Sequence, residues 1–272
     1  MRVTVLQTAV IENRSANVDN AMAQIRSAAA ADLIVLPEMF VCPYVVERFP
    51  DYAEEEPPSH GLQPLACLAR EKQVTIVAGT VPERVGLDIF NTCFVFDPAG
   101  RTVARYRKTH LFDVDIAGGP SVRESDVLTP GGSLTLFTVG VWSVGLAICY
   151  DLRFPELFRA LVMAGADVII VPAAFSAPTG AAHWADLLKV RAVDNQVYVV
   201  GAAPARDDAA PFTAYGHSMV VDPWGVVLAE TGSGPAAVAA ELQRDRLDDV
   251  RRQLPLLSQL RPELYGKDLR DR

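Results

Sequence analysis

Three side chains that could together carry out covalent catalysis stand at the ends of strand candidates in the sequence. Glu38 follows the apolar run Leu33–Pro37, Lys108 ends the alternating strand candidate Thr102–Arg107, and Cys149 closes a third, apolar run. Folds that alternate strands and helices usually place their sites at the ends of strands. The three residues are therefore candidates for one site, although the sequence by itself does not show that they meet.

These residue types fit the chemistry of a thiol hydrolase. A cysteine thiol with its ordinary pKa of about 8.5 is mostly protonated at neutral pH and needs a base or a cation beside it. Glu38 could take the thiol proton, give it to departing ammonia and later activate water. Lys108 could stabilise the thiolate and then the oxyanion. The intermediate would be a thioester of Cys149, and neither a metal nor another cofactor is required.

The sequence around Cys149 predicts a tight turn from a strand into a helix. The strand would end at Cys149, and the helix would begin within Tyr150–Glu156. We expect this turn to expose the sulfur and the N-terminus of the following helix to favour the thiolate. Backbone N–H groups just after Cys149 could also face an oxyanion.

Each candidate also has an ordinary structural explanation. A lone cysteine that ends an apolar strand is commonly an inert buried thiol, and we expect that of Cys67 and Cys93. A glutamate after a strand is commonly a solvated loop residue, and a lysine there is commonly exposed. Cys42 stands close to Glu38 in the sequence and could lie near the site without acting.

Strands and helices alternate along the chain, and turns such as Asp97–Gly100 make some strand pairs antiparallel. This pattern predicts a mixed, largely buried sheet covered by helices. No linker-like segment divides the sequence, so we expect a single domain over 1–272, with 244–272 as a C-terminal helix and tail. Helices are expected at Asn17–Ala31 (capped by Ser15 or Asn17), Gln63–Lys72, Pro155–Ala164, Ala182–Gln196 and Arg244–Leu254. Strands are expected at Val3–Leu6, Leu33–Leu36, Val74–Gly79, Phe90–Phe96, Thr102–Arg107, Leu134–Val139, Trp142–Ile148, Val168–Val171, Val197–Ala202, Ser218–Val221, Val226–Ala229 and Ala236–Glu241.

Charge and hydropathy argue against several classes of protein. The net charge is −8 and the sequence pI about 5.1, without a dense cluster of Lys and Arg, which argues against nucleic acid binding. No apolar run approaches the roughly 18 residues of a membrane span. The cysteines and histidines lack zinc-binding spacing, and the N-terminal segment does not resemble an export signal. We therefore expect free thiols and a cytoplasmic location.

At the three candidate positions the sequence resembles the nitrilase, or carbon–nitrogen hydrolase, superfamily. Its Glu–Lys–Cys signature is matched by Leu36–Glu38, by Tyr106–Phe112 and by Gly145–Glu156, in the expected order and over nearly the whole chain. By that resemblance the glutamate is the general base, the lysine stabilises the oxyanion and the cysteine is the nucleophile.

The same resemblance implies a fold and an assembly. The family fold is an α/β structure, an α-β-β-α sandwich with four layers in each protomer. Members generally dimerise through helices on one face and often exchange C-terminal tails, a part that Arg244–Arg272 could fill here. We therefore expect a homodimer or a higher homo-oligomer.

The family pattern also points to residues around the three. Glu124 matches a second glutamate near the nucleophile, which would orient Lys108 or the substrate; the alternative is a surface salt bridge. Tyr44 and Phe175 could line the pocket or could be ordinary packing residues. Tyr150, which follows the nucleophile, is a further candidate for contact with the substrate.

Within the superfamily the sequence looks most like the omega-amidases, which hydrolyse the terminal amide of 2-oxo acids such as 2-oxoglutaramate and 2-oxosuccinamate. The likeness lies in Phe49–Glu54, His110–Asp115 and Arg191–Val199. Such a substrate carries a carboxylate away from its amide. Arg153 could grip that carboxylate bidentately, unless it pairs with Glu156 on the same helix face.

The sequence also leaves other functions open. Tyr215–Gly225 resembles the sister branch that hydrolyses deaminated glutathione, and an N-carbamoyl amidohydrolase could use the same three residues. Two alternatives are not enzymes of this kind. One is a catalytically silent dimer that binds partners, although all three residues are intact. The other is a redox-sensing thiol protein, which lacks an obvious resolving cysteine.

Overall fold

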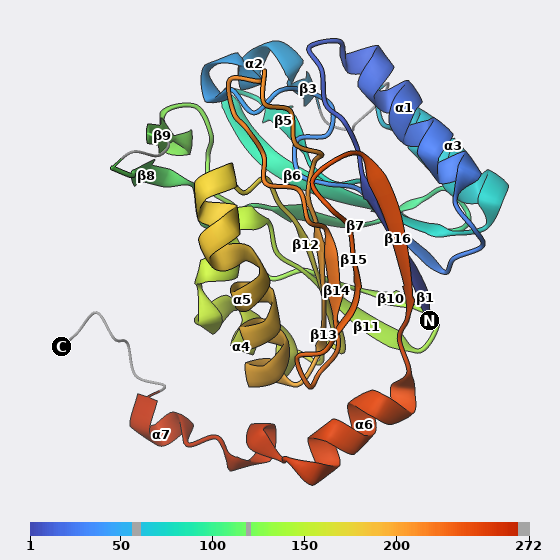
Figure 1. Cartoon of the computed structure of the whole chain (residues 1–272), viewed down its shortest axis with the longest axis vertical. Coiled ribbons are helices and arrows are strands. Elements are labelled where there is room, and N and C mark those ends of the chain that lie inside the picture. The colour runs from blue at the N-terminus through green and yellow to red at the C-terminus, as the bar shows by residue number, and fades with distance from the viewer. Residues whose placement is uncertain (56–60, 118–120, 266–272) are drawn as a thin grey trace.

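The computed structural model describes residues 1–55, 61–117 and 121–265, which form two stacked β-sheets between two layers of helices (Figure 1). The helices α1 (Arg14–Ser27) and α3 (Gln63–Lys72) cover one sheet. On the other side of the stack, α4 (Pro155–Met163) and α5 (Ala177–Asn195) cover the second sheet. The expected α-β-β-α sandwich is therefore confirmed.

The first sheet is built mostly from the N-terminal half of the chain. Within the described residues it has eight strands, in the order β16-β1-β2-β4-β6-β5-β3, with β7 beside β6. Because β6 is antiparallel to both β4 and β7, and β4 is parallel to β2, the strands β2 and β7 end at the same edge. The strands are β1 (Arg2–Gln7), β2 (Leu33–Val35), β3 (Glu54–Glu55), β4 (Thr75–Val77), β5 (Val81–Val85), β6 (Asp88–Phe96), β7 (Thr102–Arg107) and β16 (Ala236–Glu241).

The second sheet follows in the chain. The described residues give it six strands, in the order β10-β11-β12-β13-β14-β15, of which β11, β12 and β13 are parallel. A separate pair, β8 (Asp113–Asp115) and β9 (Ser121–Arg123), stands apart from both sheets. The six strands are β10 (Leu136–Val139), β11 (Trp142–Leu146), β12 (Val168–Pro172), β13 (Tyr198–Ala202), β14 (Met219–Val221) and β15 (Val227–Glu230).

Alternation along the strands builds two hydrophobic cores. Val3, Val5 and Leu33 belong to the core between the two sheets, whereas Leu6 and Ile34 belong to the core beneath α1 and α3. Successive side chains of a strand point to opposite faces, so a strand that lies between two cores is apolar at most of its positions. This is why the apolar runs of the sequence located the strands.

The first helix begins and ends earlier than expected. Its cap is Asn13, whose side chain accepts the N–H of Ala16 at 3.0 Å. Asn17 lies within the helix, and its side chain bonds to the backbone of Ile11 and to the carbonyl of Val41. Asn17 therefore ties together two loops that are distant in the sequence, which a local pattern does not reveal.

The helix α5 begins at Ala177 and not at Ala182. Proline and glycine are unfavourable in a helix interior, but proline is tolerated in the first turn of a helix. Gly180 is required by close packing, because a Cβ there would lie 2.2 Å from the Cβ of Tyr215. Tertiary contact therefore decides where this helix begins.

Short polar elements escaped the sequence analysis, because they contain too few residues to show a period. Besides β3, β5, β8 and β9 they are α2 (Phe49–Tyr52), α7 (Pro262–Tyr265) and the 3₁₀ turns η1 (Val46–Arg48), η2 (Glu124–Asp126), η3 (Cys149–Arg153) and η4 (Leu256–Gln259). Two of them, η2 and η3, carry candidate site residues.

The C-terminal segment leaves the body of the molecule along its lower end in Figure 1. Its first helix, α6 (Arg244–Gln253), buries Leu247 and Val250. Arg244 and Arg251 hold the two oxygens of the Asp167 carboxylate at 2.8 and 3.1 Å. The last part of the predicted tail, 266–272, lies outside the described residues.

Candidate active site

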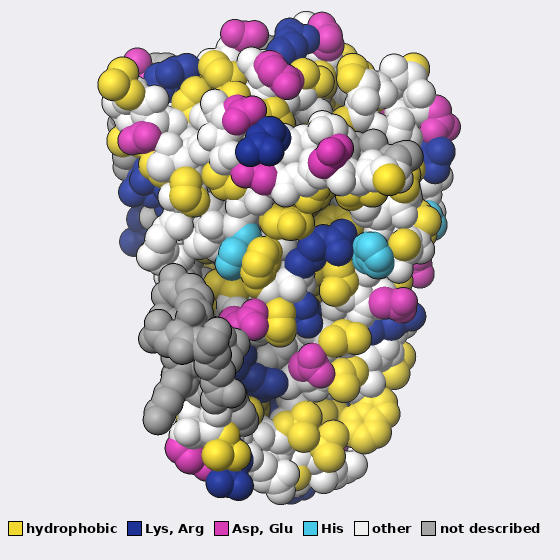
Figure 2. Space-filling model, turned by 90° about the vertical axis from the view of Figure 1, so that its left-hand side faces the viewer, with side chains coloured by type: hydrophobic (Ala, Val, Ile, Leu, Met, Phe, Trp, Pro, Cys, Tyr) yellow, Lys and Arg dark blue, Asp and Glu magenta, His cyan; other side chains and the backbone are white. Residues whose placement is uncertain are grey.

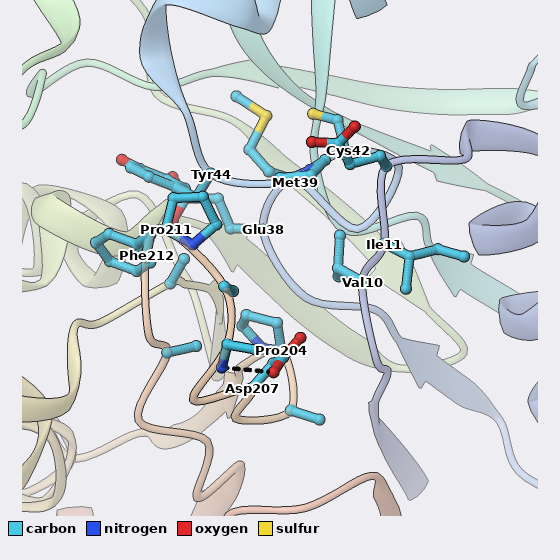
Figure 3. A pocket seen from close by; sticks show the side chains of 17 residues that line it. Val10, Ile11, Glu38, Met39, Cys42, Tyr44, Pro204, Asp207, Pro211 and Phe212 are labelled. Atoms are coloured by element: carbon cyan, nitrogen blue, oxygen red, sulfur yellow. Dashed lines mark hydrogen bonds between the residues drawn. The ribbon is translucent and has the colours of Figure 1, made fainter.

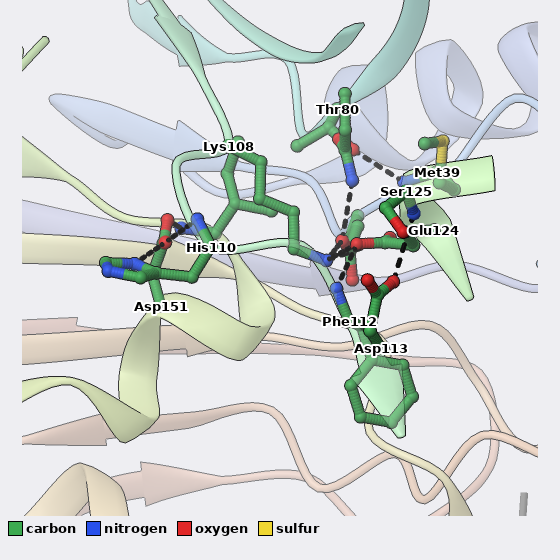
Figure 4. A network of polar contacts seen from close by, with 12 residues as sticks. Met39, Thr80, Lys108, His110, Phe112, Asp113, Glu124, Ser125 and Asp151 are labelled. Carbon is green, nitrogen blue, oxygen red and sulfur yellow. Dashed lines mark hydrogen bonds and ion pairs between the residues drawn. The ribbon is translucent and has the colours of Figure 1, made fainter. Parts of the chain in front are cut away.

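Glu38, Lys108 and Glu124 form a fully buried ion cluster, part of which Figure 4 shows. Nζ of Lys108 lies 3.0 Å from Oε1 of Glu38 and 2.9 Å from each carboxylate oxygen of Glu124. Glu38 comes shortly after β2 and Lys108 directly after β7, while Glu124 opens η2. One cation therefore faces two carboxylates, at the edge where the first sheet's strands β2 and β7 end.

Neighbouring groups fix the Glu38 carboxylate. Nδ2 of Asn91 donates to Oε1 at 2.8 Å. The next residue, Met39, has a φ of +50°, and its N–H donates to Oγ1 of Thr80 at 3.0 Å. Gly79 lets the backbone pass closely here, since a Cβ would lie 2.0 Å from a carbonyl oxygen of the bend. The chain after β2 is thus held in a bend that turns Glu38 toward the lysine.

Glu124 is held as firmly as Glu38. The hydroxyl of Tyr44 donates to one oxygen at 2.6 Å, and the N–H of Phe112 donates to the other at 2.7 Å. Burial raises the pKa of Tyr44, so its hydroxyl stays protonated and acts as a donor. Because Glu124 is fully buried against Lys108, the alternative of a surface salt bridge is wrong.

Cys149 follows a strand of the second sheet and lies beside the ion cluster. It comes shortly after β11 and opens η3 with a φ of +46°, which costs a residue with a side chain about 1–3 kcal/mol. Only 4% of the residue is exposed, so the expectation of an exposed sulfur is wrong. The following helix α4 begins at Pro155, within the predicted segment, but the turn η3 separates its N-terminus from Cys149.

Burial has the largest influence on the pKa of Cys149. Burial raises the pKa of its thiol well above the ordinary value, and the charge on Glu38 adds to this while Lys108 opposes it. Burial also raises the pKa of Glu38, against the charge of Lys108. Burial alone would lower the pKa of Lys108, but Glu124 and Glu38 outweigh it and raise that pKa. The resting site therefore holds a neutral thiol beside a charged lysine.

One oxygen of the cluster has an open position. Oε2 of Glu38 is buried and has no hydrogen-bond donor among the described residues. The Cys149 thiol lies close enough to lower the pKa of Glu38, but its geometry does not make a regular hydrogen bond. This oxygen can accept a proton from the thiol or from a bound molecule.

Asp151 is a site residue that the sequence analysis missed. Its buried carboxylate accepts hydrogen bonds from the hydroxyl of Tyr106 at 2.7 Å, from Thr109 at 2.9 Å and from the N–H of Ile148 at 2.9 Å. The backbone and ring of His110 contact it at 3.0 and 2.7 Å (Figure 4). Asp151 therefore fastens the segment after Lys108 to the turn that carries the cysteine. The only signal in the sequence was its position beside the nucleophile.

Arg153, Tyr150 and Phe175 form a neighbouring group instead of joining the buried ion cluster. The guanidinium carbon of Arg153 lies 5.2 Å from the ring centre of Phe175 and 5.9 Å from that of Tyr150. Both Nη atoms lie 3.4 Å from Nδ1 of His183. No carboxylate pairs with Arg153 among the described residues, so the expected alternative, an ion pair with Glu156, is not formed.

This group belongs to the face that carries α4, α5, β8 and β9. Figure 2 shows hydrophobic, basic and histidine side chains gathered in the middle of that face. The group adjoins the nucleophile through the chain itself, because Phe175 follows Ala174, whose backbone contacts the Cys149 sulfur. A charged ligand group bound by Arg153 would therefore lie near the buried thiol.

A cavity of about 310 Å³ reaches the cluster from another direction. Figure 3 shows Glu38 and Tyr44 beside Phe212, with Val10 and Ile11 across the cavity. Tyr44 therefore lines a pocket, as expected. The cavity is walled by three loops, which contribute Val10–Glu12, then Glu38, Met39 and Cys42–Tyr44, and then Pro204, Ala205, Asp207, Ala209–Phe212 and Ala214, together with Ala174.

The other cysteines differ in exposure. Cys93 is buried, as expected, but Cys67 is exposed, because its side of α3 faces solvent. Cys42 is buried and lines the same cavity as Glu38. Burial raises the pKa of Cys42 to about 12, which makes it a poor nucleophile.

The described part of the chain offers neither a metal site nor a membrane span. No group of three or more His, Cys, Asp and Glu side chains in it could hold a metal ion. No helix of the same residues has both the length and the apolar character to cross a membrane.

The arrangement has the parts of a nucleophilic acyl-transfer site. A thiol stands beside a carboxylate that can accept its proton, and a fixed cation stands beside the same carboxylate. A carbonyl carbon held at the sulfur would develop negative charge on its oxygen, which a preorganised cation stabilises in a dry site. The raised pKa of the thiol means that proton transfer must accompany attack.

The chain is similar to known amide hydrolases along nearly its whole length. A family model described as carbon–nitrogen hydrolase matches residues 2–252. The omega-amidase NIT2 of Homo sapiens is 42% identical over 271 residues, which are 99% of this chain and 98% of that protein. The omega-amidase NIT2 of Danio rerio is 41% identical over 267 residues, 97% of this chain and 96% of that protein.

Two solved structures share the fold. Nit3 of Saccharomyces cerevisiae, a member of branch 10 of the nitrilase superfamily, superposes with a TM-score of 0.87 at 36% identity and covers 95% of this chain and 96% of its own. A mutant amidase from Nesterenkonia sp. AN1 superposes with a TM-score of 0.84 at 25% identity and covers 99% of this chain and 97% of its own. In that amidase the acetamide moiety of fluoroacetamide is covalently added at the active-site cysteine.

Proposed function

This chain belongs to the carbon–nitrogen hydrolase family, and from that premise we propose that it removes the terminal amide of short 2-oxo dicarboxylic acid monoamides, with 2-oxoglutaramate and 2-oxosuccinamate as substrates. As a member of the nitrilase superfamily it is a hydrolase that acts on amides. The observation that carries the narrower assignment is the 42% identity to a human omega-amidase over 99% of the chain. The products are the carboxylate and ammonia.

In this proposal Cys149 is the nucleophile. Its thiol proton passes to Oε2 of Glu38 as the sulfur attacks the amide carbon, and the resulting oxyanion faces Lys108. The C–N bond then breaks, and Glu38 gives the proton to departing ammonia. Water hydrolyses the thioester after Glu38 takes one of its protons, and the sulfur leaves and regains that proton. Glu124 does not react and holds Lys108 in place.

Arg153 is the proposed partner of the substrate's carboxylate. Its guanidinium is half-buried against two aromatic rings and pairs with no carboxylate among the described residues. A planar guanidinium held in this way can form two parallel hydrogen bonds to a carboxylate. Tyr150 and Phe175 would then act by orienting Arg153, and Tyr44 by orienting Glu124.

The test is ammonia release from 2-oxoglutaramate, 2-oxosuccinamate and deaminated glutathione at matched concentrations. We expect the highest kcat/KM for the two 2-oxo amides and no release by Cys149→Ala. Arg153→Ala should raise KM for these substrates about tenfold or more, because it removes a charge-assisted pair worth about 1.5–3 kcal/mol. A preference for deaminated glutathione would instead place the chain in the sister branch. Release from none of the three would refute both substrate assignments.

We also propose that the chain is a homodimer, formed through the exposed apolar side chains of α5, of β15 and of the turn before β15. A contiguous apolar patch of this kind marks an interaction surface. The patch lies on one surface, since Val193 of α5 packs against Gly225 of the turn. Its members are Val190, Val193, Trp224, Val226 and Leu228.

Light scattering of the purified protein tests the assembly. We expect twice the chain mass of 29.4 kDa for the wild type and the chain mass for Val193→Glu. Val103→Glu, an exposed valine in β7, is the matched control and should leave the mass unchanged. A wild-type monomer would refute the proposal. The part expected of 244–272 in the dimer stays a prediction.

A further inference from the structure

Among the described residues, the cavity in Figure 3 is lined by one of the proposed catalytic groups, Glu38, and not by the other two. It reaches the neighbourhood of Cys149 only through Ala174, whose backbone contacts the sulfur. In the proposed mechanism the acyl carbon of the substrate lies at Cys149, its carbonyl oxygen lies at Lys108, and the departing nitrogen lies at Glu38. The cavity therefore extends from the amine side of the scissile bond.

An open hydrogen-bonding position points the same way. Oε2 of Glu38 is buried and accepts no regular hydrogen bond among the described residues, with only the Cys149 thiol close to the carboxylate. Oε1 is occupied by Asn91 and Lys108 at 2.8 and 3.0 Å. A buried carboxylate oxygen without a partner is costly, and an amide or amine N–H would satisfy it. Any substituent on that nitrogen would have to lie in the space beside Glu38.

The charges that line the cavity exclude an anion there. Its described lining contains Glu12, Glu38 and Asp207 and no lysine or arginine. Glu12 stands at the outer end, where Nη1 of Arg48 pairs with it at 2.7 Å. A carboxylate in this cavity would find no basic partner among the described lining residues, whereas Arg153 could supply one. A neutral or cationic group fits the cavity's charge.

The walls of the cavity are largely apolar and are fixed in place. The ring of Phe212 stacks on that of Tyr44 with centroids 4.7 Å apart, and the hydroxyl of Tyr44 is held by Glu124. Asn17 joins the loop at Ile11 to the loop that follows Glu38. A volume of about 310 Å³ lies at the lower end of the range for small-molecule pockets. It fits a small apolar group.

We propose that this cavity is a leaving-group subsite, through which the enzyme also hydrolyses secondary amides whose nitrogen carries a small apolar substituent such as a benzyl group. The inference rests on the proposed function for the role of Glu38. The bond changes are those of the primary amide: the C–N bond is cleaved, Glu38 protonates the departing amine, and water releases the acid from the thioester. The products are the carboxylate and a primary amine in place of ammonia.

The test compares two substrates that share one acyl group, 2-oxoglutaramate and its N-benzyl amide, with release of ammonia and benzylamine as the readouts. Ala210→Phe fills the cavity from the loop beyond β13, at a half-buried position. We expect it to lower kcat/KM for the N-benzyl amide, relative to the primary amide, by about tenfold or more. The matched change Ala99→Phe, in the exposed turn between β6 and β7, should leave this ratio unchanged.

A second variant guards against misfolding of the first. Val10→Ala enlarges the same cavity and should raise kcat/KM for an N-naphthylmethyl amide relative to that for the primary amide. Equal loss of both activities in folded Ala210→Phe would show that the cavity holds the acyl group and would overturn the inference. So would a wild type that cleaves the primary amide but not the N-benzyl amide.

Calorimetry separates this inference from the substrate assignment. Benzylamine should bind to Cys149→Ala, benzoate should not, and Ala210→Phe in the same background should abolish benzylamine binding. If the wild type hydrolyses neither 2-oxo amide, the substrate assignment fails, and benzylamine binding still decides whether the subsite exists. Absence of benzylamine binding together with activity on 2-oxoglutaramate would refute the subsite alone.

Discussion

Replacing Asp151 with asparagine should weaken both the fold and the reaction. Asp151 touches neither the proposed nucleophile's sulfur nor the lysine, but it joins the segments that carry them. Its Oδ2 accepts the N–H of Ile148, immediately before Cys149, and its Oδ1 accepts the N–H of His110, two residues after Lys108. It is therefore a positioning residue, whose loss should be felt in the geometry of the site.

The magnitude follows from counting hydrogen-bond donors. Oδ1 accepts from Thr109 and from the backbone N–H of His110, whose ring Nδ1 also lies 2.7 Å from it, and Oδ2 accepts from Tyr106 and from Ile148. Asparagine keeps only one acceptor oxygen, so its NH₂ must face one of these pairs. The Tyr106 hydroxyl can rotate and accept, but a backbone N–H cannot. A lost bond to a buried carboxylate costs about 1.5–3 kcal/mol, so we expect the free energy of unfolding to fall by about 3 kcal/mol.

The effect on catalysis should appear in kcat. The turn at Cys149 is strained, with a φ of +46°, and Asp151 helps to hold it. A misplacement of about 1 Å can cost about a hundredfold in rate. We expect kcat for 2-oxoglutaramate to fall by about tenfold to a hundredfold. KM should change little, because Asp151 does not contact the substrate in the proposed arrangement.

Urea unfolding followed by tryptophan fluorescence gives the stability, and ammonia release gives the kinetics. The matched control is Asp97→Asn, which also removes a carboxylate that accepts several bonds, from Ala99 and Arg101, but in a surface turn. It should cost less than about 1 kcal/mol and leave kcat unchanged. If the free energy of unfolding of Asp151→Asn equals that of the wild type, the donor count is refuted. Lost stability with unchanged kcat would refute the positioning role.

Three further outcomes are expected. Cys149→Gly should be more stable to urea than Cys149→Ala by about 1 kcal/mol, reversing the usual order, because residue 149 has a positive φ; equal midpoints would contradict the strain. Lys108→Met leaves two buried carboxylates without their cation and should cost about 3–5 kcal/mol at pH 7. That cost should shrink at pH 5, where protonation relieves the repulsion, and a cost independent of pH would argue against the ion cluster. Iodoacetamide at pH 8 should modify exposed Cys67 before Cys42, whose thiol with a pKa of about 12 is almost wholly protonated; mass spectrometry showing Cys42 modified first would disprove its burial.

The sequence located most of the framework because buried strands are mostly apolar and half-exposed strands and helices show their own periods. Thr102–Arg107, Gln63–Lys72 and Ala236–Glu241 have the predicted bounds, and other strands differ by a few residues at their ends. The errors lie where a distant contact overrides a local signal. Gly180 is unfavourable in a helix by its type, yet it lies inside α5 because only a glycine leaves room for Tyr215. The four-layer arrangement itself came from family resemblance, since alternation alone predicts only a covered sheet.

The residue types at the candidate site could also be predicted, since a thiol, a carboxylate and a lysine each stand at the end of a strand candidate. Their convergence could not, because it depends on strand order. Glu38 and Lys108 are 70 residues apart, and they meet because β2 and β7 end at the same edge of one sheet. The family resemblance supplied what the local pattern lacked. The catalytic roles themselves stay a prediction until the variants are measured.

The sequence by itself determined which side chains are available for chemistry and which segments are buried, because both follow from residue type and period. Only the tertiary structure decided the electrostatics of the site. Burial raises the pKa of the Cys149 thiol, where the local sequence suggested a favoured thiolate. The hydrogen bonds by which Asp151 joins the segments of Lys108 and Cys149 also depend on tertiary structure, as does the cavity beside Glu38. Hydrogen bonds, cavities and pKa shifts arise from distances between segments that are remote in the chain, and no local pattern encodes those distances.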